Sequence, residues 1–445
     1  MVAVINPSKA SFRRLMPLSQ ELSYYRPQQF YANYMSIRHY YKIEYIRKSE
    51  NAWLLFVRHM ASGENIVLKI LCRYKDTRYR LEAVIERQQC QLEALKWNRV
   101  LTPEVYMGLA RICDFDLNRE TIVIDDILEN PTETLDQCSE YALVMRQLPM
   151  NWRLDLLLNR ENNFSLSYYI KLLTKSLIQI HQKINPLSIE EARKWGAFQQ
   201  LKTKLEHNLA LADPVLKAIE NGQYSSYKLG ENAVNILKDT FFKIFPQGQN
   251  HLSYYRLKEN FSWLKNNLLQ TIIEGPFQQY FEQRVQRQYI KRCHGDLKAP
   301  NIWIAPIESS SDTEPEKFVR ILDAIDFNPS YYNIDVLSDL AMLVVDIQVR
   351  TKSSLFANQM IEEYLELTGQ DDKIARLVLS YYLVEKAYVG AAISFVYDNV
   401  PKLGWAFLQV ANMRMNDLKR QISSQYHFTT IESPKVSTPL SLLIL

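Results

Sequence analysis

The stretch that decides the fold reads His294-Gly295-Asp296-Leu297-Lys298-Ala299-Pro300-Asn301. In it an aspartate stands five positions before an asparagine, since 301 − 296 = 5. Enzymes that transfer phosphoryl groups need a carboxylate to take the acceptor's proton and an amide oxygen nearby to help hold Mg²⁺. The spacing therefore predicts a catalytic loop in which Asp296 is the base and Asn301 is a metal ligand. The apolar run Ile302-Trp303-Ile304 follows, as a strand would.

A second acidic cluster, Leu322-Asp323-Ala324-Ile325-Asp326-Phe327, again ends an apolar run. The segments would follow one another as a loop, a strand, a turn, a second strand and a carboxylate. This order brings a base and a metal ligand together. Mg²⁺ prefers oxygen ligands and leaves its other positions to phosphate and water. Both Asp323, which ends the strand, and Asp326, in an Ile-Asp-Phe context, are candidates to bind it with Asn301. We favour Asp323 as the principal ligand.

The two motifs together resemble the aminoglycoside phosphotransferase-like branch of the protein-kinase-like fold. The resemblance is closest to a bacterial subgroup of largely uncharacterised members, some of them fused to a P-loop domain. It also covers the segments 98–106, 140–149, 292–293 and 335–341, and extends with gaps from about residue 40 to about residue 400. The sequence contains no G-x-x-x-x-G-K-[S/T] run, which a P-loop would require.

The resemblance implies a lysine that neutralises the α- and β-phosphates of ATP, aimed by a glutamate from the following helix. Lys69 is the matching lysine, on the apolar strand 66–71. Glu86 and Glu93 are both candidates for the glutamate, because they are seven residues apart and lie on one helical face. We choose Glu93, which is nearer to the resembling segment 98–106.

The parts that would bind the rest of the nucleotide are less regular. Kinases usually place glycines between the first two strands, whereas Lys48-Ser49-Glu50-Asn51 has none. Ser49 would therefore bind phosphate through its side chain. The hinge, with Met145 and Gln147, would bind the adenine edge through backbone groups.

Several other residues around the loop have expected roles. Lys298 departs from the pattern of this branch, which usually has histidine there, whereas protein kinases have lysine; such a lysine can reach the transferred γ-phosphate. The resemblance implies that Asp339 holds backbone amides of the catalytic loop. We interpret Asp335 as a solvated carboxylate at the start of a helix. We interpret His181 as a packed core residue and not as a catalyst.

The resemblance implies an α+β, two-lobed protein-kinase-like fold, and the pattern of apolar residues predicts elements that agree with it. Short β-branched and aromatic segments predict a small lobe with a five-stranded antiparallel sheet, with strands at 41–47, 52–58, 65–71, 120–125 and 141–148. Apolar residues spaced by four and three predict one helix over about 81–95. Helical periodicity then predicts a large, mainly helical lobe, with helices at 152–158, 166–181, 192–211, 254–289, 335–349, 354–367, 371–396 and 404–423.

These elements divide the chain into four expected parts. Residues 1–36 are an extension, 37–148 the small lobe, 149–423 the large lobe, and 424–445 a tail. A helical insertion at about 186–285 would set the specificity for the acceptor. The polar run 308–316 is expected to be a hairpin loop near the active site.

Composition narrows the class of protein further. The 445 residues carry a net charge of only +4, which gives no sign of a nucleic-acid or membrane-surface partner. There is no signal-peptide pattern or membrane-spanning run, so we expect a cytoplasmic protein. The five cysteines never form C-x-x-C, which disfavours both a disulfide framework and a zinc site.

Together these features predict an ATP-dependent phosphotransferase that moves the γ-phosphate to a hydroxyl of a small molecule, with ATP and Mg²⁺ bound. Two alternatives stay open. The glycine-free loop favours a nucleotide-binding pseudokinase or scaffold. Lys298 favours a protein kinase, although no Ala-Pro-Glu follows Asp323.

Overall fold

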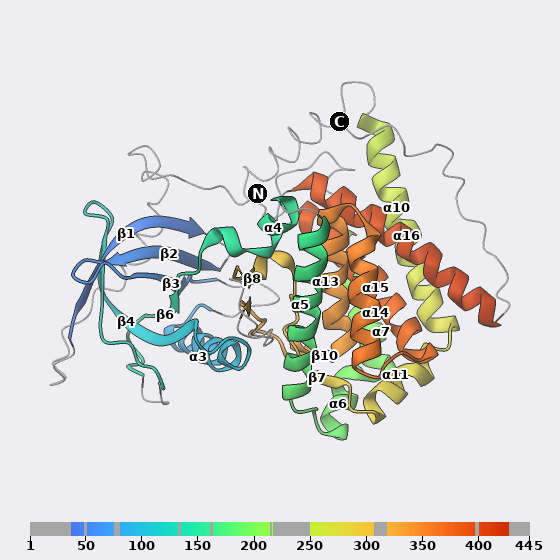
Figure 1. Ribbon diagram of the computed structural model, residues 1–445, viewed down its shortest axis with the longest axis horizontal. Coiled ribbons are helices and arrows are strands. Elements are labelled where there is room, and N and C mark those ends of the chain that lie inside the picture. Colours follow the sequence, from blue (N-terminus) through green and yellow to red (C-terminus); the bar gives the residue numbers. More distant parts are fainter. Residues whose placement is uncertain are drawn as a thin grey trace.

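The computed structural model describes residues 37–48, 51–74, 81–131, 135–160, 163–213, 216, 250–306, 318–396 and 400–426. A sheet with one long helix forms one part of the molecule, and helices dominate the other (Figure 1). The predicted α+β class is confirmed. The predicted N-terminal extension, the polar loop 308–316 and most of the tail lie outside the described residues.

The small lobe is a closed barrel of six strands in the order β1-β2-β3-β6-β4-β5. The strands are β1 (His39–Lys48), β2 (Ala52–His59), β3 (Asn65–Leu71), β4 (Tyr106–Asp116), β5 (Thr121–Ile124) and β6 (Tyr141–Arg146). The prediction of five strands is therefore wrong by one, and the additional strand is β4. Its pairing slips between Tyr106 and Gly108 and again between Ile112 and Asp114, which breaks the two-residue alternation that identifies a strand.

Strand β1 closes the barrel. It pairs with β2 along most of its length, and its first four residues, His39 to Lys42, also pair with β5. A register shift between Ile43 and Tyr45 accompanies this double pairing, as expected because a bulge bends a strand and increases its twist. Side chains such as Ile43, Leu55 and Leu68 fill the barrel interior.

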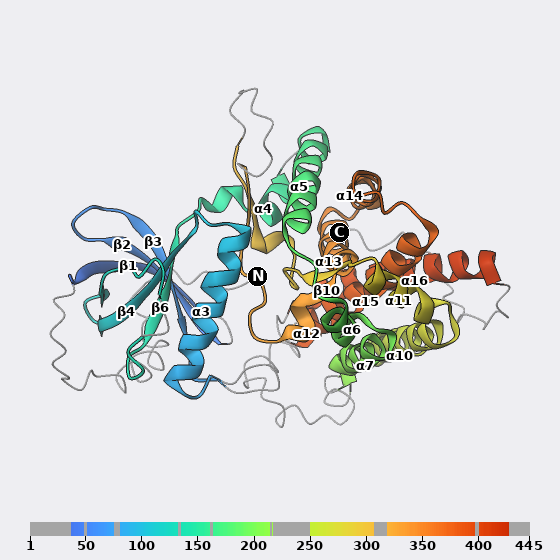
Figure 2. The same ribbon diagram turned by 90° about the horizontal axis from the view of Figure 1, so that it is seen from below.

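The helix α3 (Val84–Leu101) lies on the side of the barrel that faces the large lobe (Figure 2). Its residues Ala94 and Leu95 pack against a second apolar cluster from β4 and β6. A buried ion pair between Arg87 and Glu140 fixes the first turns of the helix to the segment that enters β6. The position of α3 is thus set by both apolar packing and a desolvated charge pair.

The large lobe is built around α13 (Val336–Thr351), in which every residue from Val336 to Val349 is buried. A helix is buried on all its faces where other elements surround it. Among its described residues the helices of this lobe are α4 (Leu154–Arg160), α5 (Asn163–Lys183), α6 (Ile189–Gly196), α7 (Phe198–Leu209), α10 (Asn250–Glu274), α11 (Phe277–Gln286), α12 (Pro329–Tyr332), α13, α14 (Ser354–Leu367), α15 (Lys373–Val396) and α16 (Pro401–Tyr426).

Two of the predicted helices are each divided in the structure. The stretch 192–211 forms α6 and α7, because Ala197 has an extended backbone between them. The stretch 254–289 forms α10 and α11, which are separated by Gly275 and Pro276. A proline has no amide hydrogen and its ring clashes with the preceding turn, so the helix cannot continue through it.

Two short ladders bring the motif segments together. β7 (Ile290–Arg292) pairs with β10 (Asn333–Asp335), and β8 (Ile302–Ile304) pairs with β9 (Val319–Ile321). None of the described helices is long and apolar enough to cross a membrane. All five cysteines are free, as expected.

Candidate active site

The catalytic loop connects β7 to β8 and makes a tight turn at Gly295. This glycine has a φ of +86°, a conformation that other L-residues rarely adopt. A Cβ atom here would lie 2.6 Å from the carbonyl oxygen of Tyr331. The turn therefore requires glycine, and Asp296 follows it directly.

Asp339, at the start of α13, holds this turn through hydrogen bonds to its backbone. Its two carboxylate oxygens accept hydrogen bonds from the backbone amides of His294, at 3.1 Å, and Gly295, at 2.9 Å. His181 lies 3.3 Å from the same carboxylate and is buried. Although burial raises the pKa of Asp339, the hydrogen bond and charge of His181 leave it below its ordinary value. The roles expected of Asp339 and His181 agree with these contacts.

A second buried aspartate, Asp346, supports the far end of the loop. Its Oδ2 accepts a hydrogen bond of 2.7 Å from the amide of Ala299, and Arg350 pairs with it one turn along α13. No local motif marks Asp346 in the sequence, so the sequence alone does not reveal it. Both ends of the loop are thus tied to one buried helix.

Asp296 has the accessibility and contacts that a base requires. Its side chain is 33% exposed, and Oδ2 lies 2.8 Å from the ammonium of Lys298. The amide of Asn301 donates to the backbone carbonyl of Asp296 at 3.0 Å. Within the described residues no hydrogen bond is directed to Asn301 Oδ1, which leaves that oxygen for a cation.

Asp323 follows β9 and lies beside Asn301, because the amide of Leu322 donates to the carbonyl of Asn301 at 2.9 Å. Two residues whose side-chain oxygens suit Mg²⁺ are thus brought together although they are far apart in the sequence. Asp323 has a φ of +64°, and its carboxylate is 62% exposed toward the cleft. The donor set of Asn301 and Asp323 fits a hard divalent cation.

Asp326 lies deeper than Asp323, close to Cys90 of α3. Burial, together with the nearby charge of Asp323, raises the pKa of Asp326 to about 6. Burial also raises the pKa of the Cys90 thiol, with the charge of Asp326 adding to the effect. Of the two candidate carboxylates, Asp323 is the more exposed and the nearer to Asn301.

Lys69 contacts Asp323, with 2.7 Å between Nζ and Oδ1. The charge of Lys69 is the main reason that the pKa of Asp323 is lowered. Glu93, the predicted partner of Lys69, instead lies 3.3 Å from Arg292, just before the catalytic loop. Glu86 caps its own helix by accepting from the amide of Ala83. The expected pairing of Lys69 with Glu93 is therefore corrected: Glu93 turns toward the large lobe and Asp323 takes its place beside the lysine.

The register of the barrel shows which side chains share a face with Lys69. Tyr45, Phe56, Val67 and Met145 are opposite one another across four successive strands. Directly opposed residues of antiparallel strands point to the same face, so these four form an apolar row. Gln147 follows β6, and Ser49 lies outside the described residues.

A parallel row contains a cation that the sequence does not identify. Arg47, Leu54, Lys69 and Leu143 are opposed in the same way, which places Arg47 and Lys69 on one face with Leu54 between them. Burial lowers the pKa of Arg47, and the like charge of Arg153 adds to this. The sequence does not reveal this position of Arg47, because the strand has a bulge after Ile43. Counting alternate residues past the bulge would place Arg47 on the same face as Ile43, inside the barrel.

Asp335 differs from its expected role. It does begin helix α13 by accepting a hydrogen bond of 2.9 Å from the amide of Leu337, but it is buried and not solvated. Arg284 of α11 binds both of its carboxylate oxygens, at 2.6 and 2.7 Å. The pair links the helical insertion to the strand that runs beside β7.

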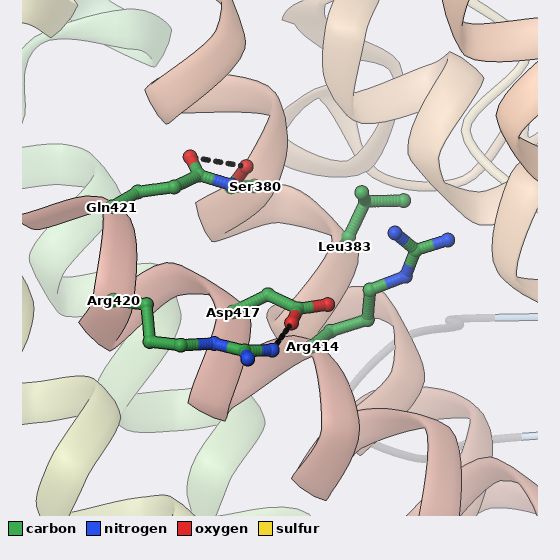
Figure 3. Close-up of a pocket in the computed structure, with 6 residues that line it drawn as sticks. All are labelled: Ser380, Leu383, Arg414, Asp417, Arg420 and Gln421. Atoms are coloured by element: carbon green, nitrogen blue, oxygen red, sulfur yellow. Dashed lines mark hydrogen bonds and ion pairs between the residues drawn. The ribbon is translucent and has the colours of Figure 1, made fainter.

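A separate hollow of about 220 Å³ lies between α15 and α16, away from the catalytic loop. Its polar side chains largely bind one another or their neighbours. Ser380 donates to Gln421 at 3.1 Å, and Arg420 pairs with Asp417 (Figure 3). We therefore take the group of side chains around Asp296 and Asp323, and not this hollow, as the candidate active site.

Comparison with known proteins gives structural similarity but no sequence match. No protein-family model and no curated protein matches the chain. Among solved structures, a choline kinase from Cryptosporidium parvum is similar with a TM-score of 0.42 at 10% identity, covering 93% of this chain and 96% of that one. An ethanolamine kinase from Plasmodium vivax has a TM-score of 0.41 at 12% identity, covering 86% of this chain and 84% of that one.

An aminoglycoside phosphotransferase from Alicyclobacillus acidocaldarius is also similar, with a TM-score of 0.41 at 10% identity, covering 86% of this chain and 93% of that one. The structural neighbours thus include aminoglycoside phosphotransferases, as the resemblance in sequence predicts, together with choline and ethanolamine kinases. Because identities and TM-scores are low, we argue function from the residues of the site itself.

Proposed function

We propose that this protein is a phosphotransferase that uses ATP and Mg²⁺ to phosphorylate a hydroxyl group of a small molecule. One observation carries the proposal: four groups of the required kinds converge from distant segments. Lys69 lies 2.7 Å from Asp323, Asp323 follows a residue hydrogen-bonded to Asn301, and Asn301 is hydrogen-bonded to Asp296. These four groups would supply a base, two metal ligands and a phosphate-binding cation at one site.

The triphosphate would lie under the cleft-facing side of the barrel. Lys69 would neutralise its α- and β-phosphates, and Arg47, on the same face, would add a second cation. This arrangement compensates for the glycine-free loop between β1 and β2, since side-chain charge replaces backbone amides. The apolar row that ends at Met145 would cover the base, and Met145 and Gln147 would provide backbone groups for its edge. Ser49 is proposed as a further phosphate contact.

Asp296 would accept the proton of the acceptor hydroxyl as its oxygen attacks the γ-phosphorus. The bond between that phosphorus and the oxygen bridging to the β-phosphate breaks, and ADP leaves with the electron pair. Lys298, 2.8 Å from Asp296, would stabilise the transferred phosphoryl group. Asn301 and Asp323, together with Asp326, would hold Mg²⁺, which would supply charge neutralisation for the phosphate oxygens.

A pseudokinase that binds nucleotide without turning it over is the second candidate. The observation that favours it is that Glu93 pairs with Arg292, whereas Lys69 pairs with Asp323. A protein kinase is the third, and it rests on Lys298 alone. Turnover of ATP, measured with hydroxylated small molecules and with a generic protein acceptor, separates the three.

Two variants separate chemistry from binding. Asp296→Asn should keep ATP binding but lose transfer by about 10²- to 10⁴-fold, the usual contribution of a positioned acid or base. Asp323→Asn should abolish turnover and also weaken the Mg²⁺-dependent part of ATP binding. ATP affinity with and without Mg²⁺, measured by calorimetry, distinguishes the two.

The matched control is Asp417→Asn, on the distant α16, which should leave both ATP affinity and turnover at parent levels. If the parent binds no ATP at millimolar concentrations, the proposal fails. If Asp326→Asn loses Mg·ATP binding while Asp323→Asn does not, the principal metal ligand is Asp326.

A further inference from the structure

Three polar side chains of the small lobe bind the backbone around Asp323. Thr102 donates to the carbonyl of Ile321 at 2.8 Å and accepts from the amide of the same residue at 3.1 Å. The Tyr106 hydroxyl accepts from the amide of Asp323 at 2.9 Å. The remaining bond, from the amide of Ala324 to Asn98 Oδ1, is 3.0 Å long. The backbone is thus held before, at and after the proposed metal ligand.

The backbone at Asp323 needs such support. Its φ of +64° lies in the left-handed region, which residues with a Cβ seldom occupy without constraints from their surroundings. The neighbouring hydrogen bonds provide constraints on both sides of this residue. They leave its carboxylate free of backbone contacts and 62% exposed toward the cleft.

The three side chains are themselves rigid. Asn98, Thr102 and Tyr106 are each at most 3% exposed. Asn98 donates through Nδ2 to the carbonyl of Ala94 at 2.8 Å, which fixes the direction of its oxygen toward Ala324. Thr102 ends α3, and its own amide binds the carbonyl of Asn98 at 2.8 Å. The end of α3 and the start of β4 therefore form one preformed set of hydrogen-bonding groups.

We propose that Asn98, Thr102 and Tyr106 are positioning residues that hold Asp323 in the conformation in which it binds Mg²⁺. None of the three is proposed to touch metal or nucleotide. The inference rests on the proposed function, because it assigns these residues to the metal site of that reaction. It also gives the segment 98–106, which resembles the family, a physical role.

The test compares hydroxyl deletions at these positions with matched deletions elsewhere. The test variants are Thr102→Val and Tyr106→Phe. The controls are Thr174→Val, which removes a buried hydroxyl that donates to Ile170, and Tyr141→Phe, which removes one that accepts from the amide of Asp136. For each protein, ATP affinity is measured with saturating Mg²⁺ and with a chelator, and stability is measured by urea unfolding.

We expect the test variants to lose about three- to tenfold in the enhancement of ATP affinity by Mg²⁺, the equivalent of one ordinary hydrogen bond. ATP affinity in the presence of chelator should stay at the parent value in all four variants. The controls should keep the full Mg²⁺ enhancement even where they lose as much stability as the test variants. If Thr102→Val fails to fold, the test rests on Tyr106→Phe, which removes a single oxygen atom.

Equal Mg²⁺ enhancement in test and control variants would overturn the inference and leave the proposed function intact. A parent protein that binds ATP in neither condition would overturn both. If the parent protein binds ATP equally well with and without Mg²⁺, the proposed metal site is wrong, and so is the role assigned to these three residues. The outcomes are therefore distinguishable.

Discussion

The catalytic loop and the metal-ligand segment serve one proposed reaction but are held by different parts of the molecule. The loop is fixed from within the large lobe, where the carboxylates of Asp339 and Asp346 accept hydrogen bonds from its amides. The segment around Asp323 is fixed from the small lobe by the hydroxyl groups of Thr102 and Tyr106 and the amide oxygen of Asn98. One element is anchored by carboxylates and the other by hydroxyl and amide groups.

This difference separates two requirements of the site. The position of Asp296, the proposed base, depends on a buried helix that forms the centre of the large lobe. The position of Asp323, the proposed metal ligand, depends on how α3 and β4 meet the large lobe, and so on the relation between the lobes. Substitutions of the residues that hold the catalytic loop should therefore affect mainly turnover, and substitutions of the residues that hold Asp323 should affect mainly metal binding.

The largest effect is expected for Asp339→Asn. The amide that replaces one carboxylate oxygen cannot accept a hydrogen bond from the loop backbone, and hydrogen bonds to charged groups contribute about 1.5–3 kcal/mol each. We expect a loss of about that size in the free energy of unfolding, measured in urea, together with loss of turnover. The Mg²⁺ enhancement of ATP affinity should change little, because Asp323 is supported from the other lobe.

An equal loss of Mg²⁺ enhancement in Asp339→Asn would contradict the separation of the two supports. The control is Asp213→Asn, whose carboxylate pairs with Lys265 near the surface of the large lobe. Exposed pairs of this kind contribute at most about 1 kcal/mol, so its stability and ATP binding should stay close to those of the parent.

A smaller and pH-dependent effect is expected for Asp326→Asn. The folded-state pKa of about 6 exceeds the ordinary value of 3.8, so the folded protein binds more protons than the unfolded chain between these values. The parent should therefore lose stability as the pH rises from about 4 to about 6. Above this window the variant should be more stable than the parent, by at most about 3 kcal/mol at 1.36 kcal/mol per pKa unit.

The measurement is urea unfolding of parent and Asp326→Asn at a series of pH values from 4 to 8. The same variant should bind Mg·ATP less tightly if Asp326 assists the metal. A stability difference that is constant across the series would show that burial of the charge is not its cause. A difference that shrinks as the pH rises would contradict the direction of the shift.

The smallest effect is expected for Glu93→Gln. Its carboxylate is 47% exposed and pairs with Arg292, so its loss should change the free energy of unfolding by less than about 1 kcal/mol. Lys69→Ala should weaken ATP binding, and the double variant should show the sum of the two single effects because the residues do not pair. Non-additive ATP affinities would restore Glu93 as the partner of Lys69.

Residues in local motifs are the ones that the sequence identifies best. Asp296 and Asn301 occur within one eight-residue stretch, and most helices and strands follow from periodicity with small errors at their ends. Asp339 is found only through the resemblance, because nothing in its own segment distinguishes it from Asp335. Asp346 lies on the same buried helix without any motif.

The remaining residues depend on pairings that no local pattern contains. Glu93 pairs with Arg292, which is 199 residues further along the chain, and Thr102 is hydrogen-bonded to Ile321, which is 219 residues further along. Arg47 shares a face of the barrel with Lys69 because β1 has a bulge, and no pattern in the sequence indicates where that bulge lies. Strand β4 is obscured for the same reason, since irregular pairing removes the alternation on which its prediction depends.

The closed barrel of the small lobe has a consequence for association with other chains. Each of its six strands has a hydrogen-bonded neighbour on both sides. An open sheet exposes backbone amides and carbonyls at its edges, where another chain can add as a further strand. Closure removes those edges, so a macromolecular partner of this lobe has to recognise its side chains and cannot extend its sheet.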